Sequence, residues 1–350
     1  MALGEFGNKM KIGEFDLDKD VLVVAEIGNN HEGSYTLAEE MVGQAAQIGA
    51  DAVKFQTFQA ELLVGRSNKA RFEQLKSYEL TFDQFERLSK VAEDAGLIFL
   101  STPFDLPSAE FLNGVVPAFK IASGDNTFYP LIEKIASTGK PIIMSTGLST
   151  LEQIVSVKEF IEEIWRRGRI RQEMAILHCV ACYPVPSDQA NLRAIERLKD
   201  ELDCTVGYSD HTIGIEAAVL SVALGAQIVE KHFTINKNYS VFRDHQLSAD
   251  PAEMATLVRR IRDAREYMGS ADKIIQQAEE ENVAQLRRSI VAGKDLEEGA
   301  VLSWDDLAWV RPAGGLAAGC ERQLLNKTLS RNIRRGEIIT IEDVYESVRA

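Results

Sequence analysis

Two histidines have the chemistry and the placement to hold a metal ion. His211 ends the segment VGYSDH, and His232 lies near the end of QIVEKHF. Neutral imidazole is a common ligand of divalent transition metals. Two ring nitrogens supplemented by carboxylates and water predict Mn²⁺, with Mg²⁺ and Co²⁺ as alternatives, whereas a structural Zn²⁺ site normally has four Cys or His ligands. The alternative interpretation is that both rings are hydrogen-bonded core histidines.

Two lysines interrupt otherwise apolar segments. Lys54 lies in AVKFQTF and Lys120 in AFKIASG. A buried ammonium group needs a partner, so each lysine could form an ion pair with Glu26 or another carboxylate. The functional alternative is a cationic clamp for a phosphate or carboxylate. Hydroxyl groups that could add neutral donors to such a clamp belong to Ser101, Thr102, Ser123, Ser145 and Ser209.

These residues lie in segments that have the composition of buried strands. Eight such segments are 21–28, 52–58, 97–103, 118–124, 141–147, 174–180, 206–211 and 227–233. Their near-continuous apolar character is typical of parallel strands. Eight βα units in about 250 residues predict an α/β fold, a (β/α)8 TIM barrel over residues 1–270. A doubly wound open sheet is the alternative.

Helical segments alternate with the strands. Residues 34–48 have Ser34 as a candidate N-cap. Residues 149–165 open with S-T-x-E, which resembles a capping box. Residues 250–268 begin with Asp250 as a cap and Pro251 in the first turn.

Polar side chains follow all eight predicted strands. In a (β/α)8 barrel the carboxyl ends of the strands lie on one face and carry the active site. A purely structural barrel would not need these side chains, because buried polar groups cost free energy unless they are paired. The pattern therefore predicts that the histidines, lysines and serines above converge on one site.

The character of the chain changes after residue 270. Residues 271–288 are charged and predict a linker or a bridging helix. Residues 289–350 contain short apolar runs, in which D-L-E-E-G-A-V-L is echoed by N-I-R-R-G-E-I-I. We predict a small β-rich domain with a weak internal repeat. Because it is too small for a large core, it should pack against the barrel or another subunit.

Composition narrows the classes of function. The chain has 350 residues, with 39 Lys+Arg, 53 Asp+Glu and a formal net charge of −14. This balance argues against non-specific binding to nucleic acid. We find no apolar run of about 18 residues for a membrane span and no secretory signal. The four cysteines form no repeated CxxC pair, which favours a reducing compartment. We expect a cytoplasmic protein that binds neither nucleic acid nor membranes.

Motifs along almost the whole chain resemble the sialic acid synthase family. They are A-E-I-G-N-N-H-E-G (25–33), V-K-F-Q-T (53–57), S-T-P-F-D (101–105), F-K-I-A-S-G-D (119–125), K-P-I-I-M-S-T-G (140–147), L-H-C-V-A-C-Y-P (177–184), G-Y-S-D-H-T (207–212) and E-K-H-F-T (230–234). The segment 289–302, followed by W-V-R-P, resembles the family's antifreeze-protein-like (SAF) domain. The resemblance implies condensation of phosphoenolpyruvate with N-acetylmannosamine or a related acylamino sugar, giving a nine-carbon 2-keto acid and inorganic phosphate.

The resemblance also implies a role for each matching residue. The metal ligands would be His211 and His232. The phosphoenolpyruvate-binding residues would be Lys54, Lys120, Ser123 and Ser209. The residues around the sugar would be Glu26, Gln56, Tyr183 and Asp244. Arg311 of the small domain would reach the partner subunit's site in a domain-swapped homodimer. Glu26 is the candidate for proton handling or for positioning the attacking water.

The sequence departs from the family pattern at three places. Asp125, which we include in the catalytic set, stands where the family commonly has Glu. Ala181 replaces a polar residue. The segment Phe242-Arg243-Asp244-His245 replaces Gly-Pro-Asp-His beside the expected sugar pocket. The sugar is therefore open, and a diacetamido precursor of legionaminic or pseudaminic acid is an alternative.

Two other functions compete with this interpretation. A metal-dependent aldolase that uses pyruvate would release no phosphate. A carbohydrate-binding or ice-binding protein would have a catalytically dead barrel. The combination of Glu26, Lys54, Lys120, His211 and His232 argues against an inactive barrel.

Overall fold

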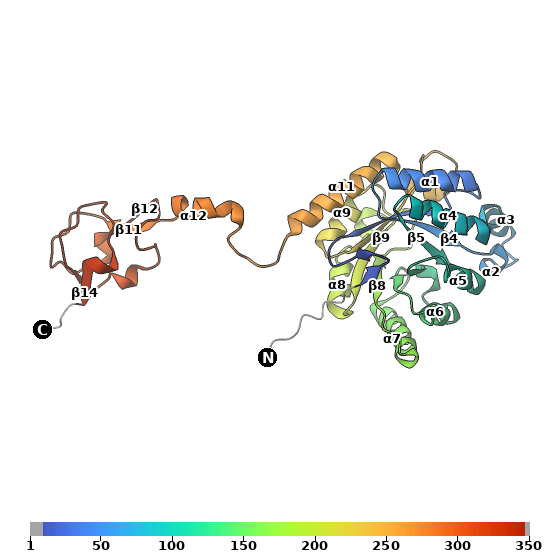
Figure 1. Ribbon diagram of the computed structural model, residues 1–350, viewed down its shortest axis with the longest axis horizontal. Helices are drawn as coiled ribbons and strands as arrows, with labels where there is room; N and C mark the ends of the chain where they lie inside the picture. The colour runs from blue at the N-terminus through green and yellow to red at the C-terminus, as the bar shows by residue number, and fades with distance from the viewer. Residues whose placement is uncertain (1–9, 347–350) are drawn as a thin grey trace. The chain divides into compact units, whose positions relative to one another are not determined.

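The first part of the chain is a barrel of eight parallel strands. The computed structural model describes residues 10–346. The barrel strands are β3 (Leu22–Gly28), β4 (Ala52–Thr57), β5 (Ile98–Pro103), β6 (Phe119–Ile121), β7 (Ile142–Ser145), β8 (Met174–Cys179), β9 (Thr205–Asp210) and β10 (Ile228–His232). They pair in the order β5-β4-β3-β10-β9-β8-β7-β6, and β6 also lies beside β5. With the helices outside the strands (Figure 1), this confirms the predicted (β/α)8 barrel.

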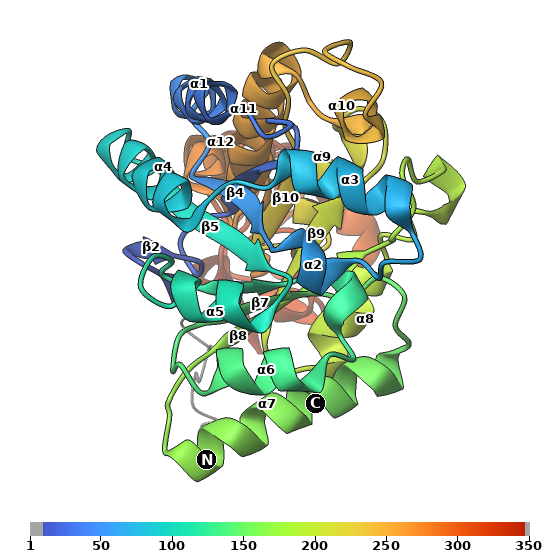
Figure 2. The same cartoon turned by 90° about the vertical axis from the view of Figure 1, so that its right-hand side faces the viewer.

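The helices form the outer layer. They are α1 (Tyr35–Gln47), α2 (Ala60–Leu63), α3 (Lys69–Tyr78), α4 (Phe82–Asp94), α5 (Leu106–Leu112), α6 (Tyr129–Ala136), α7 (Leu151–Gly168), α8 (Ala194–Glu201), α9 (Glu216–Ala223), α10 (Arg243–Leu247) and α11 (Pro251–Met268). Figure 2 looks onto the barrel and shows α4, α5, α6 and α7 following one another around the strands.

Capping side chains set where the predicted helices begin. Ser34 caps α1 by accepting a hydrogen bond from the Leu37 amide, and Asp250 caps α11, as predicted. For α7 the predicted position was wrong by one residue. The capping box joins Thr150 and Gln153, so the S-T-x-E motif is not the box. The Ser149 hydroxyl instead accepts a hydrogen bond from Asn126 at 3.1 Å.

Two apolar layers hold the barrel together. One layer lies between the strands and the helices and contains Phe55, Phe85 and Ile176, all buried. The other fills the barrel interior at the amino ends of the strands. The antiparallel hairpin β1 (Lys11–Ile12) and β2 (Phe15–Asp16), which the sequence did not indicate, adds Ile12 to this inner layer. Each large side chain buried in this way stabilises the fold by about 1.5–3 kcal/mol.

The residues after Gly269 form a second compact unit. It contains α12 (Glu280–Leu286), β11 (Ser289–Ala292), β12 (Leu307–Val310), β13 (Lys327–Leu329) and β14 (Val344–Glu346). Its internal repeat is visible in the structure. Ser303 with Asp306, and Thr340 with Asp343, form equivalent capping boxes at the starts of two short 3-10 helices. The unit has its own small apolar core.

No helix within residues 10–346 combines the length and the apolar character needed to cross a membrane.

Candidate active site

A polar cavity of about 420 Å³ opens at the carboxyl ends of the barrel strands. Eleven of the residues expected from the sequence line it: Glu26, Lys54, Gln56, Lys120, Ser123, Ser145, Tyr183, Ser209, His211, His232 and Asp244. These residues come from seven strands and the loops that follow them. The fold therefore brings together side chains that lie far apart in the sequence.

The alternation of side chains along a strand decides which residues enter the cavity. Lys54 and Gln56 point inward on β4, and Thr102 of β5 lines the cavity beside them. Ser101 is one residue earlier on β5 and therefore faces the helix layer. Its hydroxyl lies 2.7 Å from that of Thr57. Both hydroxyl groups were expected as neutral donors. Thr102 lines the cavity, whereas Ser101, which was also expected to bind substrate, does not.

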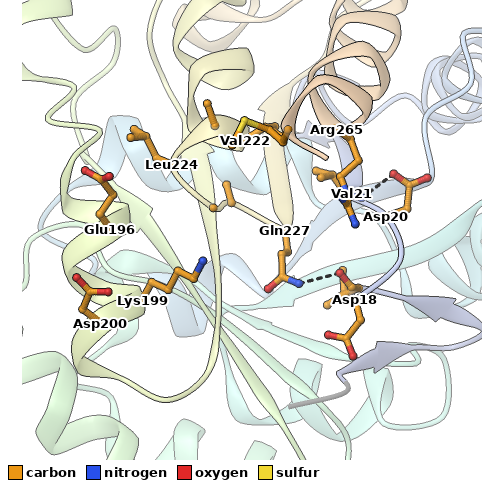
Figure 3. A pocket seen from close by; sticks show the side chains of 15 residues that line it. Asp18, Asp20, Val21, Glu196, Lys199, Asp200, Val222, Leu224, Gln227 and Arg265 are labelled. Atoms are coloured by element: carbon orange, nitrogen blue, oxygen red, sulfur yellow. Dashed lines mark hydrogen bonds between the residues drawn. The ribbon is translucent and has the colours of Figure 1, made fainter. Parts of the chain in front are cut away.

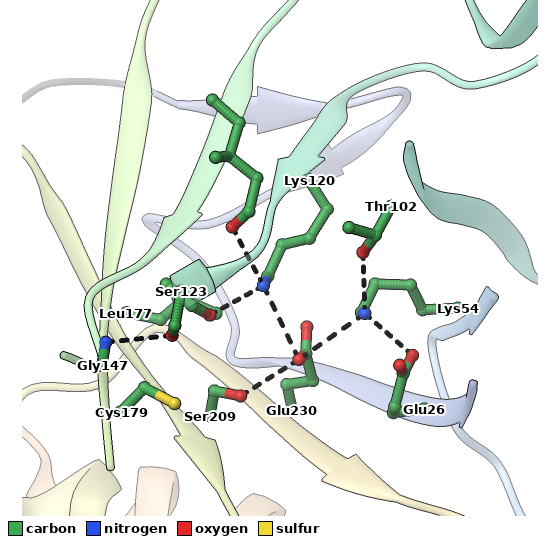
Figure 4. Close-up of polar contacts among 12 residues, drawn as sticks. Glu26, Lys54, Thr102, Lys120, Ser123, Gly147, Leu177, Cys179, Ser209 and Glu230 are labelled. Atoms are coloured by element: carbon green, nitrogen blue, oxygen red, sulfur yellow. Dashed lines mark hydrogen bonds and ion pairs between the residues drawn. The ribbon is translucent and has the colours of Figure 1, made fainter. Parts of the chain in front are cut away.

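Four ionisable side chains form the floor of the cavity (Figure 4). Lys54 Nζ lies 2.9 Å from Glu26 Oε2 and 3.7 Å from Glu230 Oε1. Lys120 Nζ lies 3.8 Å from the same Glu230 oxygen. We call Glu26, Lys54, Lys120 and Glu230 the floor cluster. Both interpretations of the lysines therefore meet here, since the ammonium groups are ion-paired and also face the cavity.

Burial and mutual attraction set the protonation of the floor cluster. Burial raises the pKa of Glu26 to about 7, even though Lys54 opposes the shift. The pKa of Glu230 is lowered, because Lys120 and Lys54 outweigh its burial. Burial lowers the pKa of Lys120, while the two carboxylates outweigh burial at Lys54 and raise its pKa. Glu26 is thus the carboxyl group of the cluster that can exchange a proton near neutral pH.

Hydroxyl groups extend the floor cluster. Lys120 Nζ donates to Ser145 Oγ at 2.7 Å, and Lys54 Nζ donates to Thr102 Oγ1 at 3.1 Å. Ser209 Oγ donates to Glu230 Oε1 at 3.0 Å. These contacts fix the two ammonium groups side by side, which is the arrangement needed to bind an anion with two charged donors.

The chain turn after Glu26 leaves room for its carboxylate. The pairing of β3 with β4 is irregular between Glu26 and Gly28, and Gly28 has a φ of +55°. A Cβ atom on Gly28 would lie 3.2 Å from Glu26 Oε1 and 3.3 Å from Gln56 Nε2. The positive φ favours glycine here, and a Cβ atom would press on the ends of the Glu26 and Gln56 side chains. Gln56 Nε2 also donates to Glu26 Oε1 at 3.3 Å.

The two histidines lie next to each other at one side of the cavity. Their ring centres are 5.4 Å apart. Nδ1 of His211 is 3.0 Å from the Val180 carbonyl, so a proton on Nδ1 leaves the lone pair on Nε2 free for a ligand. Nδ1 of His232 is buried and has no hydrogen-bond partner among the described residues.

The protonation of the histidines differs. Burial lowers the pKa of His232 well below its usual value. Burial also acts to lower the pKa of His211, but Cys179 and the Val180 carbonyl reverse that shift and raise it. The neutral ring of His232 suits a metal. Across residues 10–346, no group of three or more His, Cys, Asp or Glu side chains is arranged to hold a metal ion. The protein itself would therefore supply two nitrogens.

The wall beside the histidines comes from the loop after β8 and from α10. The Tyr183 ring lies 4.2 Å from the His211 ring, and the guanidinium of Arg243 lies 4.6 Å above Tyr183. Asp244 Oδ1 is 3.3 Å from Arg243 Nε. Phe242 packs edge-on against Tyr78 at 5.3 Å. This wall is where the sequence departs from the family pattern.

Sequence reasoning missed two charged residues of the cavity. Glu230 was noticed only as a polar strand end, although its position two residues before His232 places it on the same face of β10. Arg71 reaches the cavity from α3, whose sequence carries no motif that we recognised.

Two expected residues lie elsewhere. Asp125 follows the lining residue Gly124 in a 3-10 turn but does not itself line the cavity. Burial raises its pKa to about 6 against the opposing effect of Lys120, and its Oδ2 has no partner among residues 10–346. Arg311 belongs to the second unit, where it is exposed. Its role at a partner subunit's site stays a prediction.

Another cavity, of about 560 Å³, lies at the opposite, amino ends of the strands (Figure 3). Its lining includes Asp20, Lys199, Gln227 and Arg265. Val21 and Gln227 immediately precede β3 and β10. Because barrel enzymes carry their chemistry at the other end of the strands, we assign the active site to the polar cavity.

The fold and the polar cavity define a (β/α)8-barrel protein whose cavity has a floor of two lysines and two glutamates beside a histidine pair. Its family follows from sequence comparison. Residues 41–273 match the model of the NeuB family, and residues 287–344 match the SAF domain. The chain belongs to the NeuB family, which confirms the resemblance to sialic acid synthases.

Three similar proteins show how far the likeness extends. The N,N'-diacetyllegionaminic acid synthase of Campylobacter jejuni is 38% identical, over 92% of this chain and 99% of the relative. The human N-acetylneuraminate-9-phosphate synthase is 32% identical, over 81% of each chain. The crystal structure of the N-acetylneuraminic acid synthetase of Leptospira borgpetersenii, in complex with citrate, has a TM-score of 0.74 and 33% identity, and covers 79% of this chain and 95% of that one.

Proposed function

We propose that this enzyme condenses phosphoenolpyruvate with the open-chain aldehyde of an N-acylated amino sugar, giving a nine-carbon 2-keto acid and inorganic phosphate. The observation that carries the proposal is the floor cluster, which holds two ammonium groups beside Glu230 in a cavity that also contains the histidine pair. Family membership and the names of the relatives support the same reaction.

We assign the binding of phosphoenolpyruvate and the proton transfer to different residues of the floor cluster. Lys54 and Lys120 bind the phosphate and carboxylate of phosphoenolpyruvate. C3 of phosphoenolpyruvate attacks C1 of the sugar, and the new C–C bond leaves positive character at C2. Water adds at C2, and the tetrahedral intermediate loses phosphate by cleavage of the C–O bond. Glu26, with a pKa near 7, takes up the proton released by the water and returns it to the new C1 alkoxide, which becomes a hydroxyl. The proton of the C2 hydroxyl leaves with the phosphate when the ketone forms.

His211 and His232 would hold a divalent cation, for which we propose Mn²⁺. The buried, unpartnered Nδ1 of His232 and the orientation of His211 by the Val180 carbonyl fit this role. When bound, the cation would supply Lewis-acid polarisation of the sugar carbonyl. Gln56, Tyr183 and Asp244, which line the same cavity, position the sugar.

A diacetamido sugar is the second candidate for the acceptor. The C. jejuni relative that is 38% identical is a legionaminic acid synthase, whereas the human N-acetylneuraminate-9-phosphate synthase is 32% identical. We further propose that the active form is a domain-swapped homodimer in which Arg311 completes the partner subunit's site.

Keto-acid formation and phosphate release test the reaction directly. The enzyme is treated with chelator and then assayed with phosphoenolpyruvate, a panel of acylamino sugars, and either Mn²⁺ or none. Metal-dependent formation of keto acid and phosphate in equal amounts supports the proposal. Keto acid formed from pyruvate without phosphate would favour an aldolase, and no product with any sugar would exclude the condensation.

A further inference from the structure

Asp244 reaches the cavity from a loop that leaves β10 and returns to it. The Thr234 amide donates to the Ala249 carbonyl at 3.0 Å, and the Ala249 amide donates to the His232 carbonyl at 2.8 Å. We call residues 234–249 the α10 loop. Because its two ends are joined at the barrel, the position of Asp244 depends on what holds the middle of the loop.

A buried histidine of the α10 loop has partners outside the cavity. His245 follows Asp244, has no exposed surface and is not among the residues that line the cavity. Its Nε2 lies 3.1 Å from Glu32 Oε1, and its Nδ1 lies 2.7 Å from Thr234 Oγ1. Burial lowers the pKa of His245 against the raising effect of Glu32, so the ring is neutral at physiological pH. With its proton on Nε2, the ring donates to Glu32 and accepts from the Thr234 hydroxyl.

Glu32 holds the α10 loop at two places. The Oε1 atom that accepts from His245 also accepts from the Ser240 hydroxyl. Ser240 Oγ in turn accepts from the Phe242 amide at 3.0 Å. Ser240 and His245 flank the segment 241–244, which carries three residues of the cavity lining. One carboxylate oxygen therefore fixes both ends of the segment that forms this wall.

The turn that carries Glu32 is itself fixed. Glu32 has a φ of +46°, in the left-handed region that few residues other than glycine adopt. The next residue, Gly33, has a φ of +82°, and a Cβ atom there would lie 2.1 Å from the Ser77 carbonyl oxygen at the end of α3. Strained backbone of this kind persists only where the surrounding structure determines it. The turn therefore gives Glu32 a defined position from which to hold the α10 loop.

A second contact keeps the α10 loop in place without Glu32. Asn30, which is fully buried, donates from Nδ2 to Ser248 Oγ at 3.0 Å. Ser248 Oγ donates to the Asp244 carbonyl at 2.5 Å. Removing the Glu32 carboxylate should therefore shift the segment 241–244 without unfolding the loop.

We propose that Glu32 is a positioning residue for the acceptor sugar, which acts through His245 and Ser240 to hold Asp244 toward the cavity. This inference rests on the proposed condensation, in which Asp244 positions the sugar. Hydrogen bonds to an ionised carboxylate are about twice as strong as neutral ones, so Glu32 is a strong acceptor for both contacts. Misplacing a substrate-positioning group by about 1 Å costs about 100-fold in rate. A residue that does not touch the sugar therefore sets how well the enzyme uses it.

Steady-state kinetics of E32A, E32Q and the control E79A test the inference. Keto acid is measured with phosphoenolpyruvate, Mn²⁺ and either N-acetylmannosamine or a 2,4-diacetamido mannose, whichever the wild type uses faster. Glu79 is the matched control, because its side chain is 20% accessible against 22% for Glu32. It accepts from the Ala60 amide at 3.0 Å and so holds α2, none of whose residues lines the cavity.

We expect E32A to lower kcat/KM for the sugar by roughly 10- to 100-fold and to leave the KM for phosphoenolpyruvate within about twofold of the wild type. E32Q keeps an oxygen that accepts from His245 and Ser240, so it should recover most of the loss. E79A should match the wild type. In the double variant E32A/D244N the loss should be smaller than the product of the two single losses, because both substitutions weaken the same contact to the sugar.

Three outcomes would overturn the inference. One is an E32A variant that uses the sugar as well as the wild type does. Another is a KM for phosphoenolpyruvate that rises as much as the KM for the sugar, which would mean a general distortion of the site. The third is a double variant whose loss equals the product of the single losses, which would mean that Glu32 does not act through Asp244. A wild type that forms no keto acid from any acylamino sugar would count against the condensation, and this inference would fail with it.

Discussion

Two clusters of buried charges lie back to back on the same barrel strand and have opposite surroundings. Glu230 of β10 faces the cavity and belongs to the floor cluster. The next residue, Lys231, faces the helix layer and pairs with Asp210 of β9 at 2.9 Å, with both side chains fully buried. Successive residues of a strand point to opposite faces, so Glu230 belongs to the candidate site while its neighbour Lys231 belongs to a structural ion pair. We call Lys231 and Asp210 the structural pair.

Hydrogen bonding separates the two clusters further. Asp210 Oδ1 accepts from the Thr212 amide and hydroxyl, both at 2.8 Å, and from the Tyr208 hydroxyl at 3.2 Å. Lys231 donates to Asp210 and to the Thr212 carbonyl. Every charge of this pair is thus satisfied inside the protein. The floor cluster instead leaves its ammonium groups facing the cavity, where a substrate can replace part of their pairing.

The first prediction concerns the structural pair, Lys231 and Asp210. Lys231→Met should lower the free energy of unfolding by about 3–5 kcal/mol, because it leaves the Asp210 carboxylate buried without its cation. Chemical denaturation of the variant and the wild type measures the difference. Lys199→Met, at the distant amino end of the barrel, is the control. A loss below about 1 kcal/mol would contradict the idea that the pair depends on both charges.

The second prediction concerns the floor cluster. Lys120→Met should lower kcat/KM by roughly 100- to 1,000-fold, the effect of removing one preorganised donor to a reacting group. Its stability should change little, since the substitution relieves the burial of an ammonium group while Glu230 keeps Lys54 as a partner. Steady-state kinetics and denaturation of the same preparation separate the two effects. A large loss of stability with unchanged kinetics would mean that Lys120 stabilises the fold and does not act on the substrate.

The third prediction concerns His31, a buried titratable residue that packs against Phe55 in the layer between strands and helices. Burial lowers the pKa of His31 from 6.5 to about 4 in the folded protein, against a raising effect of the Gly28 carbonyl. The unfolded chain therefore binds a proton before the folded one does as the pH falls. The stability that comes from neutral His31 is fully present above pH 6.5. It is lost as the pH falls from 6.5 to about 4, and the total loss in the free energy of unfolding is about 3 kcal/mol.

His31→Asn should remove this pH dependence. The asparagine oxygen can accept from the Gly33 amide as Nδ1 of His31 does, at 3.1 Å, but it does not titrate. Denaturation curves at pH 7.5 and pH 4 for both proteins give the difference, from which carboxyl groups common to both cancel. If the variant loses as much stability on acidification as the wild type, the pKa of His31 is not depressed.

The sequence predicted the barrel and most of the cavity because both depend on local rules. Apolar runs followed by polar residues mark parallel strands whose ends meet. It could not resolve which of two adjacent polar residues enters the cavity when both lie at a strand end. Ser101 and Thr102 were both expected as donors, and Glu230 was given no role, because the face to which each side chain points depends on the register of the strand with its neighbours. Arg71 comes from a helix, where nothing local indicates the approach to the cavity.

The smallest predicted effect tests the same rule with the same substitution on each face. Ser145 accepts from Lys120 at 2.7 Å inside the cavity, so Ser145→Ala should lower kcat/KM by roughly tenfold, since a hydrogen bond to a charged group is lost. The Ser101 hydroxyl forms a hydrogen bond with the helix-layer hydroxyl of Thr57, so Ser101→Ala should cost about 1 kcal/mol of stability and leave the kinetics unchanged. Both variants remove one hydroxyl, and the face of the strand decides whether that hydroxyl has a partner in the cavity or in the helix layer. Equal kinetic losses would mean that the barrel interior and the helix layer are coupled through β5 and β7, and that the face of a strand does not decide function here.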